Sequence, residues 1–313
     1  MSRDTLHGDG VPATIVVTGG SGFIGSAVVA LAVEQGHRVV SLIRECEPLP
    51  AIGGVGHRMI DWSDAPGLAA VLADVSPQTV IHCAGSTGRA GEDVSALYRA
   101  NVETVWDLLT AVKSGCPRAG VVLLSSAAVY GPEPMTPTRE EAFLAAQTHY
   151  AASKVLAEEL SRTFAAIDGV RCVVARPFNV VGPREPAGSV TARIIRQFES
   201  AGDEARVAVN LRESASIRDF VDVEDVASAL LFLGERGVAG AAYNVCSGRG
   251  VSIAEMVAAV ARVEGRDFDL TVDDPSASGT ASIGSPDALT LLGWAPRHDL
   301  EGSLRRMLAF RRP

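Results

Sequence analysis

Short apolar runs alternate along most of the chain with stretches in which apolar residues recur every three or four positions. Bounded apolar runs of four to eight residues indicate buried strands, and the recurring pattern indicates amphipathic helices. Their alternation is typical of an α/β fold with a doubly wound parallel sheet. The pattern predicts strands over 13–17, 38–44, 59–62, 80–85, 120–126, 206–209 and 242–246, and helices over 26–35, 98–113, 150–166, 190–199, 224–233 and 252–263.

Three glycines stand three positions apart where the first run ends, at Gly19, Gly22 and Gly25. Gly19 allows a tight bend, Gly22 removes the side chain that would hold a pyrophosphate off the backbone, and Gly25 lets the helix lie close against its strand. The N-terminus of that helix offers unpaired N–H groups to phosphate. A purely structural turn is the alternative, because turns collect glycine. The pattern predicts that a dinucleotide binds at Gly19, Gly22, Phe23, Ile24 and Gly25.

The ends of the second and third predicted strands indicate which dinucleotide binds. An acidic residue about 20 positions after the glycines binds the adenosine ribose, whereas an arginine nearby suits a 2′-phosphate. That place holds Ile43 and then Arg44. The pattern favours NADP(H), with NAD(H) possible and a surface arginine as the alternative. Asp61 and Trp62 are expected to point toward the adenine, unless Asp61 caps the next helix.

Small residues end the fourth predicted strand, at Cys83, Ala84 and Gly85. They let a cofactor pass the carboxyl edge of the sheet, and Ser86 after them is a candidate substrate contact. His82 lies inside the apolar run and is interpreted as a core residue. Asn101 interrupts an apolar helix face. Because a buried amide needs partners, Asn101 is expected to tie neighbouring loops together at the cofactor site.

Ser126, Tyr150 and Lys154 form the most reactive set in the chain. Tyr150 and Lys154 are four positions apart, so they share a helix face roughly 5 to 6 Å apart at Cβ. A tyrosine of pKa ~10 is a poor base at neutral pH, but an adjacent positive charge favours the phenolate. Ser126 ends a buried strand and can donate to the same substrate oxygen. Together they supply the acid/base chemistry that interconverts a carbonyl and an alcohol.

Composition and charge argue against several other classes of protein. The chain has 313 residues, 47% hydrophobic and 21% charged, so one globular body with a smaller lobe is expected. A net charge of -9 argues against binding nucleic acid, and the arginines at 305, 306, 311 and 312 are interpreted as a solvated helix face. No apolar run reaches the roughly 20 residues of a membrane span. Residues 1–12 lack an apolar signal segment and are expected to form a flexible tail.

Cysteine and histidine usage indicates a reduced protein without a metal. The five cysteines are scattered and form no Cys-x-x-Cys pair, which favours free thiols and a cytoplasmic location. The six histidines are equally dispersed, and no His/Cys or His/Glu spacing is that of a metal site. We therefore expect neither a structural nor a catalytic metal.

Several separate motifs together resemble the extended short-chain dehydrogenase/reductases that act on nucleotide-diphosphate sugars, also called the NAD-dependent epimerase/dehydratase family. The resemblance spans 14–310 and is carried by the glycine triplet, Asp61, Ser125-Ser126-Ala127-Ala128-Val129-Tyr130-Gly131, Tyr150-x-x-x-Lys154, Arg176-Pro177-Phe178-Asn179-Val180-Val181-Gly182-Pro183 and Arg218-Asp219-Phe220-Val221-Asp222-Val223. It implies a Rossmann domain over 13–178, to which 217–246 returns, and a discontinuous substrate-binding lobe of 179–216 and 247–313.

The resemblance also implies roles for single residues. Tyr150 would be the acid/base, Lys154 would lower its pKa and hold the nicotinamide ribose, and Ser126 would orient the reacting sugar oxygen. Asn179 and Arg218 would grip the nucleotide diphosphate. The backbone of Pro177 and Val180 would run along the nicotinamide amide, and Val181 stands where the family usually has tyrosine.

Three reactions of this family begin with hydride transfer at C4 of the sugar. Dehydratases carry an Asp-Glu pair where this chain has Ala127 and Ala128, which disfavours dehydration. Arg44 favours a 4-ketoreductase that uses NADPH, and segments 209–223 and 243–248 resemble reductases of GDP-4-keto-6-deoxy sugars. A 4-epimerase that keeps its NAD is the runner-up. A cofactor-binding regulator without catalysis is disfavoured, because the serine, tyrosine and lysine are all present.

The resemblance further implies a homodimer formed through a four-helix bundle. The candidate helices are 96–113 and 150–166. The second of them carries the apolar residues Ala151, Val155, Leu156, Leu160 and Phe164. These side chains form the dimer face in one interpretation and pack on the sheet in the other.

Overall fold

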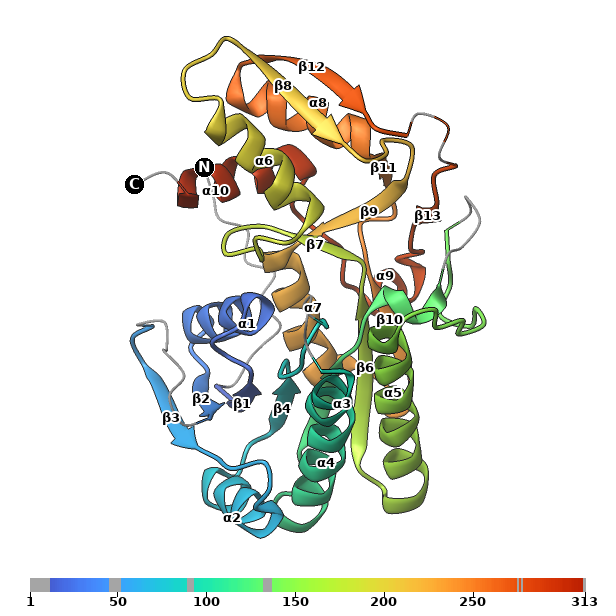
Figure 1. Cartoon of the computed structure of the whole chain (residues 1–313). Helices are drawn as coiled ribbons and strands as arrows, with labels where there is room; N and C mark the ends of the chain where they lie inside the picture. The colour runs from blue at the N-terminus through green and yellow to red at the C-terminus, as the bar shows by residue number, and fades with distance from the viewer. Residues whose placement is uncertain are drawn as a thin grey trace.

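A seven-stranded parallel sheet forms the centre of the computed structural model, which describes residues 12–44, 52–88, 93–131, 137–274, 276 and 278–311 (Figure 1). The strand order is β10-β6-β5-β4-β1-β2-β3, and every neighbouring pair is parallel. This confirms the predicted doubly wound sheet. Residues 1–11 of the predicted tail lie outside the described residues. The strands are β1 (Thr14–Thr18), β2 (Arg38–Ile43), β3 (Val55–Met59), β4 (Thr79–His82), β5 (Gly120–Leu124), β6 (Arg171–Pro177) and β10 (Ala242–Val245).

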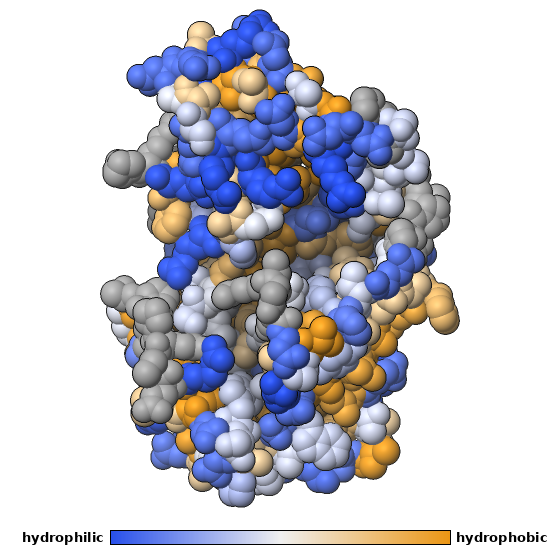
Figure 2. Space-filling view, in the orientation of Figure 1, coloured by the Kyte–Doolittle hydropathy of each residue, from blue (hydrophilic) through white to orange (hydrophobic). Residues whose placement is uncertain are grey.

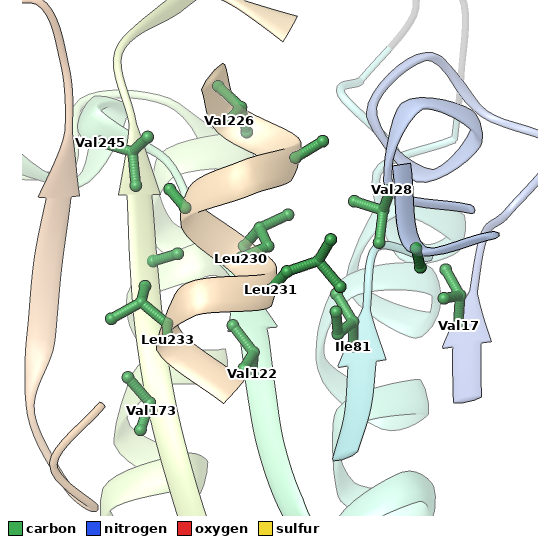
Figure 3. Close-up of a cluster of buried hydrophobic side chains, with 14 of the residues drawn as sticks. Val17, Val28, Ile81, Val122, Val173, Val226, Leu230, Leu231, Leu233 and Val245 are labelled. Carbon is green, nitrogen blue, oxygen red and sulfur yellow. The ribbon is translucent and has the colours of Figure 1, made fainter. Parts of the chain in front are cut away.

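Helices cover both faces of this sheet because its inner strands are apolar on both sides. Val17, Ile81 and Val122 pack against α1 (Phe23–Glu34) and α7 (Val223–Arg236) (Figure 3). The alternate residues Val16 and Val80 face the opposite layer. That layer consists of α2 (Ala65–Val75), α4 (Thr104–Gly115) and α5 (His149–Asp168). Over the described residues, no helix has the length and apolarity that a membrane span requires.

A smaller lobe lies beyond the sheet and has a core of its own (Figure 1). Ile194, Phe198, Met256 and Met307 are buried in that core. Strands β8 and β12 pair in parallel beside the helices, and a capping box formed by Ser252 and Glu255 begins α8. The lobe contains α6 (Val190–Ser200), β8 (Arg206–Leu211), α8 (Ile253–Glu264), β12 (Asp267–Val272) and α10 (Leu300–Arg311).

A second, four-stranded sheet runs between these two parts. Its centre is β9 (Ile217–Asp222), which pairs with β7 (Asn179–Val181), β11 (Gly250–Ser252) and β13 (Ala281–Ser282). Within the segment 217–246, β10 therefore joins the large sheet, whereas β9 joins this one. Helix α9 (Asp287–Leu292) lies near β10. The four strands of this sheet come from distant parts of the sequence, and their pairing brings these segments side by side.

Two predicted elements differ from the structure. The third strand is β3, which ends at Met59, so Asp61 and Trp62 follow the strand instead of lying in it. As an edge strand with no buried residue, β3 lacks the apolar run that reveals the inner strands. The helix predicted over 98–113 is divided into α3 (Val94–Tyr98), the π-helical η1 (Arg99–Glu103) and α4. The widened turn places Asn101 in the interior, where it is 1% exposed.

Two arginines of α10 correct the prediction of a solvated helix face. The Arg306 guanidinium lies 2.5 Å from the buried carboxylate of Asp222, and Arg311 lies 2.7 Å from Glu199. Both partners stand far away in the sequence, so spacing along the helix could not reveal them. Arg312 lies outside the described residues.

Candidate active site

The glycine-rich turn is as tight as its sequence predicts. Gly19 has a φ of 66°, and a Cβ there would lie 2.7 Å from the backbone nitrogen of Ala84. A Cβ at Gly25 would lie 2.1 Å from the carbonyl oxygen of Gly19, so Gly25 seats the helix on the turn itself. No side chain caps α1 at Gly22. The first turn of the helix, with Phe23 and Ile24, therefore presents its N–H groups for an anion.

The ends of β1 and β4 are joined through a buried histidine. His82 Nδ1 lies 2.8 Å from the hydroxyl of Thr18, which also accepts the Ala84 N–H at 3.2 Å. Burial, aided by the charge of Lys154, lowers the pKa of His82 to about 3. His82 is thus a neutral core residue, as predicted. Cys83 and Ala84 follow it at the carboxyl edge of the sheet.

Asn101 ties two segments together, as predicted. Its carbonyl oxygen accepts the Ser86 N–H at 2.8 Å, and its amide donates to the Ser86 carbonyl and to the Ser153 hydroxyl, both at 2.9 Å. Gly85 has a φ of 154°, and a Cβ there would lie 2.7 Å from Asn101 Oδ1. Asn101 therefore fixes the loop after β4 against α5.

Ser126, Tyr150 and Lys154 meet at the end of β5. The Ser126 hydroxyl accepts the Ala128 N–H at 3.2 Å and is hydrogen-bonded to Tyr150. Lys154 Nζ donates to the Leu124 carbonyl at 3.0 Å. Helix α5 carries both catalytic candidates and begins at Thr148, whose side chain caps it. The short helix η2 (Ala127–Tyr130) follows Ser126.

The electrostatics of this group correct one prediction. Burial raises the pKa of Tyr150, and the hydrogen bond from Ser126 opposes that rise. Lys154 makes no resolved contribution to the pKa of Tyr150, and its ammonium donates to the Leu124 carbonyl. Burial is also the main cause that lowers the pKa of Lys154, to about 8. Tyr150 is consequently a neutral phenol, and so a proton donor, at neutral pH.

A cleft of about 340 Å³ opens beside Ser126. Figure 2 shows the surface hollowed between the two lobes in the middle of the view. Arg218 is the one charged residue among the described residues that line the cleft, which suits an anionic ligand. The lining comes from the residue before η2 and η2 itself, from the start of α5, from the end of β6, from β7 and β9, and from β13 and the residue before it: Ser126, Ala127, Ala128, Thr148, Pro177, Phe178, Asn179, Arg218, Thr280 and Ser282.

Arg218 and Asn179 are held in place at one wall of the cleft. The Arg218 guanidinium donates to the Thr280 carbonyl at 2.6 Å and to its hydroxyl at 2.9 Å. Asn179 donates to the Asp219 carbonyl at 3.1 Å. Burial lowers the pKa of Arg218, which nevertheless stays protonated at neutral pH. Val180 follows Asn179 in β7 and is half-buried.

The residues predicted at the adenosine end lie beside the ends of β2 and β3. Arg44 follows β2 and is exposed. Asp61 accepts from the Ser63 N–H at 2.9 Å and from its hydroxyl at 2.7 Å. Asp64, and not Asp61, caps α2, so the alternative interpretation of Asp61 is wrong. The Trp62 ring packs edge-on against His82 with centroids 5.8 Å apart.

Sequence reasoning missed the role of Asp219. Its buried carboxylate accepts the Ser247 N–H and hydroxyl at 2.8 and 2.6 Å, the Gly248 N–H at 2.9 Å and the Gly284 N–H at 3.2 Å. Asp219 thereby fixes β9, and Arg218 beside it, to two later segments. The sequence signal for this role was the position of Asp219 in the motif 218–223, directly after Arg218.

One group of side chains in the described part of the chain could offer three ligands to a cation. Oxygen or nitrogen atoms of Asp222, Glu224 and His298 lie within 4.8 Å of one another. The site is empty, and the Arg306 guanidinium already lies against two of its carboxylates. The group is brought together from distant parts of the sequence, where spacing could not show it.

Fold and site together define an NAD(P)-dependent enzyme of the short-chain dehydrogenase/reductase type. Residues 15–246 match the NAD dependent epimerase/dehydratase family, and the chain belongs to this family. It is 33% identical over 331 residues to the UDP-glucose 4-epimerase of Azospirillum brasilense, with 95% of this chain and 92% of that one covered. It is also 33% identical over 307 residues to the GDP-6-deoxy-D-mannose reductase of Pseudomonas aeruginosa, with 94% and 96% covered. The solved structure of RMD from Pseudomonas aeruginosa complexed with NADPH matches with a TM-score of 0.77 at 30% identity, over 95% of this chain and 98% of that one.

Proposed function

We propose that this enzyme reduces the C4 carbonyl of a nucleotide-diphosphate 4-keto-6-deoxy sugar to an alcohol. Bound NADPH supplies the hydride that reaches C4. Tyr150 donates a proton to the carbonyl oxygen, Ser126 donates a hydrogen bond to the same oxygen, and Lys154 holds the nicotinamide ribose.

The observation that carries the proposal is the arrangement after β5: the Ser126 hydroxyl is hydrogen-bonded to Tyr150, and Ser126 lines the cleft. A carbonyl oxygen bound there could accept from both hydroxyls, and Tyr150 would give it the proton that a developing alkoxide needs. Ala127 and Ala128 line the cleft beside Ser126 and offer no carboxyl group. Removal of water from the sugar, which needs a second acid/base pair, is therefore disfavoured.

The charge in the cleft supports the choice of substrate class. Arg218 and Asn179 would bind the diphosphate of the nucleotide sugar, since Arg218 supplies the positive charge among the described lining residues. The lobe 179–216 and 247–313 would enclose the nucleotide, and Ser86 would contact the sugar from the Rossmann domain 13–178. The resemblance of the chain to the Pseudomonas reductase is consistent with a deoxysugar.

The cofactor would lie along the carboxyl edge of the sheet. The glycine-rich turn would hold its diphosphate, and Arg44 would favour a 2′-phosphate and hence NADPH. The adenine would lie near Asp61 and Trp62. The remaining predicted contacts are Cys83, Ala84, Gly85, Asn101, Pro177 and Val180.

The test is a reduction assay with purified protein. GDP- and dTDP-4-keto-6-deoxy sugars are supplied with NADPH or NADH, and loss of reduced-nicotinamide absorbance is compared with product formed. The proposal expects one NADPH consumed per product and a deuterium from labelled NADPH at C4. A preference for NADH over NADPH would contradict the proposal that Arg44 binds a 2′-phosphate.

Replacing Tyr150 with Phe tests the proton donor directly. The change removes one hydroxyl and should lower kcat by roughly 10²- to 10⁴-fold while changing the Kd for NADPH much less. Tyr98→Phe is the matched control, because the Tyr98 hydroxyl makes an exposed contact with His149 at 3.3 Å. Equal loss in both variants would mean that Tyr150 acts only through packing.

A 4-epimerase with tightly held NAD is the second candidate. The 33% identity to the Azospirillum UDP-glucose 4-epimerase over 95% of this chain favours it. An epimerase would interconvert two C4 epimers with no added cofactor and no net change in nicotinamide absorbance. That result, obtained with the same preparation, would show that the epimerase hypothesis is right and the reductase hypothesis is wrong.

A homodimer through α4 and α5 also belongs to the proposal. Trp106 on α4 is 53% exposed and Leu156 on α5 is 47% exposed, whereas Ala151 and Phe164 are buried within the subunit. We expect sedimentation at low micromolar concentration to give twice the chain mass of 32.6 kDa, and Leu156→Glu to give the single mass. A single mass for the unchanged protein would remove the dimer.

A cytoplasmic location also belongs to the proposal. The four cysteines in the described part of the chain are free thiols: Cys83, Cys116, Cys172 and Cys246. Reduced thiols are typical of the cytoplasm.

A further inference from the structure

A buried carboxylate joins the catalytic helix to the strand that ends at the catalytic serine. Glu158 lies four positions after Lys154 on α5, one helical turn away. The Ser125 hydroxyl donates to its Oε1 at 2.5 Å. Lys154 itself donates to Leu124. Leu124 and Ser125, at the end of β5, are therefore hydrogen-bonded to residues in two successive turns of α5.

The other side of Glu158 is clamped by an arginine. Arg176 Nε lies 3.0 Å from Glu158 Oε1, and Nη2 lies 2.6 Å from Oε2. Glu158 and Arg176 are 0% and 3% exposed. A buried ion pair is stable only when its remaining polar atoms are also bonded. The third arginine nitrogen meets this condition, because it donates to the Tyr130 hydroxyl at 2.8 Å and to the Glu140 carbonyl at 3.0 Å.

The network continues to the strand at the edge of the large sheet. The Tyr130 hydroxyl donates to Asn244 Oδ1 at 2.7 Å, and the Asn244 amide donates to the Thr138 carbonyl at 2.9 Å. Arg176 directly precedes Pro177, which lines the cleft. The network thus connects β5, β6, β10 and α5 behind the cleft wall, and Glu158 is its member on the catalytic helix.

The groups that act on Lys154 explain why the charge of Glu158 matters. Burial is the main cause that lowers the pKa of Lys154 to about 8, and negative charge at Cys83 and Glu158 opposes it. Cys83 is a neutral thiol at neutral pH, because burial raises its pKa to about 12. His82 is neutral as well, and Tyr150 keeps its proton. Glu158, which is paired with Arg176, is therefore the carboxylate among the groups that act on this ammonium.

We propose that Glu158 is a positioning residue: its carboxylate, clamped by Arg176 and Ser125, holds α5 against the end of β5 and lies one helical turn from Lys154, where it supports the charge of the ammonium. The role of Lys154 in reduction rests on the proposed function, but the spacing of Lys154 and Glu158, one turn apart on α5, does not. A change at Glu158 should therefore alter the titration of Lys154 even in a preparation that has no substrate.

The chain offers an unusually simple measurement of this effect, because Lys113 and Lys154 are its two lysines. Protein carrying lysine labelled with carbon-13 at Cε should give two resonances, which are followed from pH 6 to 11. Glu158→Gln removes the charge at constant size, and the Lys154 midpoint is expected to fall by roughly one pH unit. Glu158→Asp moves the charge away by one methylene, so a smaller fall in the same direction is expected.

Asp168→Asn is the matched control. Asp168 Oδ1 lies 2.6 Å from Lys113 Nζ at the surface, so this change should alter the Lys113 resonance and leave the Lys154 midpoint in place. Thermal unfolding identifies variants that stay folded, and Glu158→Asp carries the test if Glu158→Gln does not fold. A Lys154 midpoint that is the same in the unchanged protein and in the folded Glu158 variants would overturn the proposal.

A second measurement separates this proposal from the proposed function. In the reduction assay, the alkaline fall of kcat/KM should move with the Lys154 midpoint of each variant. If the midpoints shift as expected but no nucleotide sugar is reduced, the proposed function is wrong and the positioning role stands. If reduction is observed and the midpoints do not move, Glu158 serves folding alone.

Discussion

At the scale of the residue, two protonation states should govern the proposed reduction. Burial raises the pKa of Tyr150, whereas it lowers the pKa of Lys154 to about 8. As the pH rises through about 8, Lys154 should lose the charge that is proposed to hold the nicotinamide ribose, so kcat/KM for reduction should fall. Lys154→Met should abolish this limb and lower the rate at every pH, as measured in initial-rate profiles from pH 6 to 10. If the alkaline fall of kcat/KM is unchanged in that variant, another titrating group causes it.

At the scale of the element, the contact between α1 and the glycine-rich turn should tolerate no side chain. A Cβ at Gly25 would lie 2.1 Å from the Gly19 carbonyl oxygen, so Gly25→Ala must push the helix away from the turn. The free energy of unfolding should fall by about 1 to 3 kcal/mol, and the Kd for NADPH should rise. Gly53→Ala is the control, because nothing lies within 4 Å of its Cβ position. Urea unfolding and fluorescence titration measure the two effects, and equal behaviour of the variants would contradict the prediction.

At the scale of the whole molecule, Glu185 makes stability depend on pH. Burial raises its pKa from 4.5 to about 7, and its Oε2 has no hydrogen-bond partner among the described residues. Between these values the folded protein binds more protons than the unfolded chain, so the free energy of unfolding should fall as the pH rises from about 4.5 to 7. The change is on the order of 2 kcal/mol. Glu185→Gln should flatten this dependence in urea unfolding at pH 5 and 7.5, and an equal slope in both proteins would contradict it.

The sequence by itself determined the features that depend on neighbours along the chain. The inner strands of the large sheet are apolar on both faces, so their runs were visible, and the turn at Gly19, Gly22 and Gly25 follows from steric limits that three positions reveal. The spacing of Tyr150 and Lys154 likewise fixed their shared helix face. Ser126 could be placed beside them because the strands of a parallel sheet end at one edge.

Only the tertiary structure decided the features that depend on desolvation and on contacts between distant residues. It placed the edge strand β3, whose exposed residues carry no apolar pattern, and it reversed the direction expected for the pKa of Tyr150, since burial outweighs the hydrogen bond from Ser126. It also paired Arg176 with Glu158, 18 positions apart. The physical reason is the same in each case: the cost of removing a polar group from water, and the partner that offsets it, are set by packing in three dimensions and leave no periodic trace in the sequence.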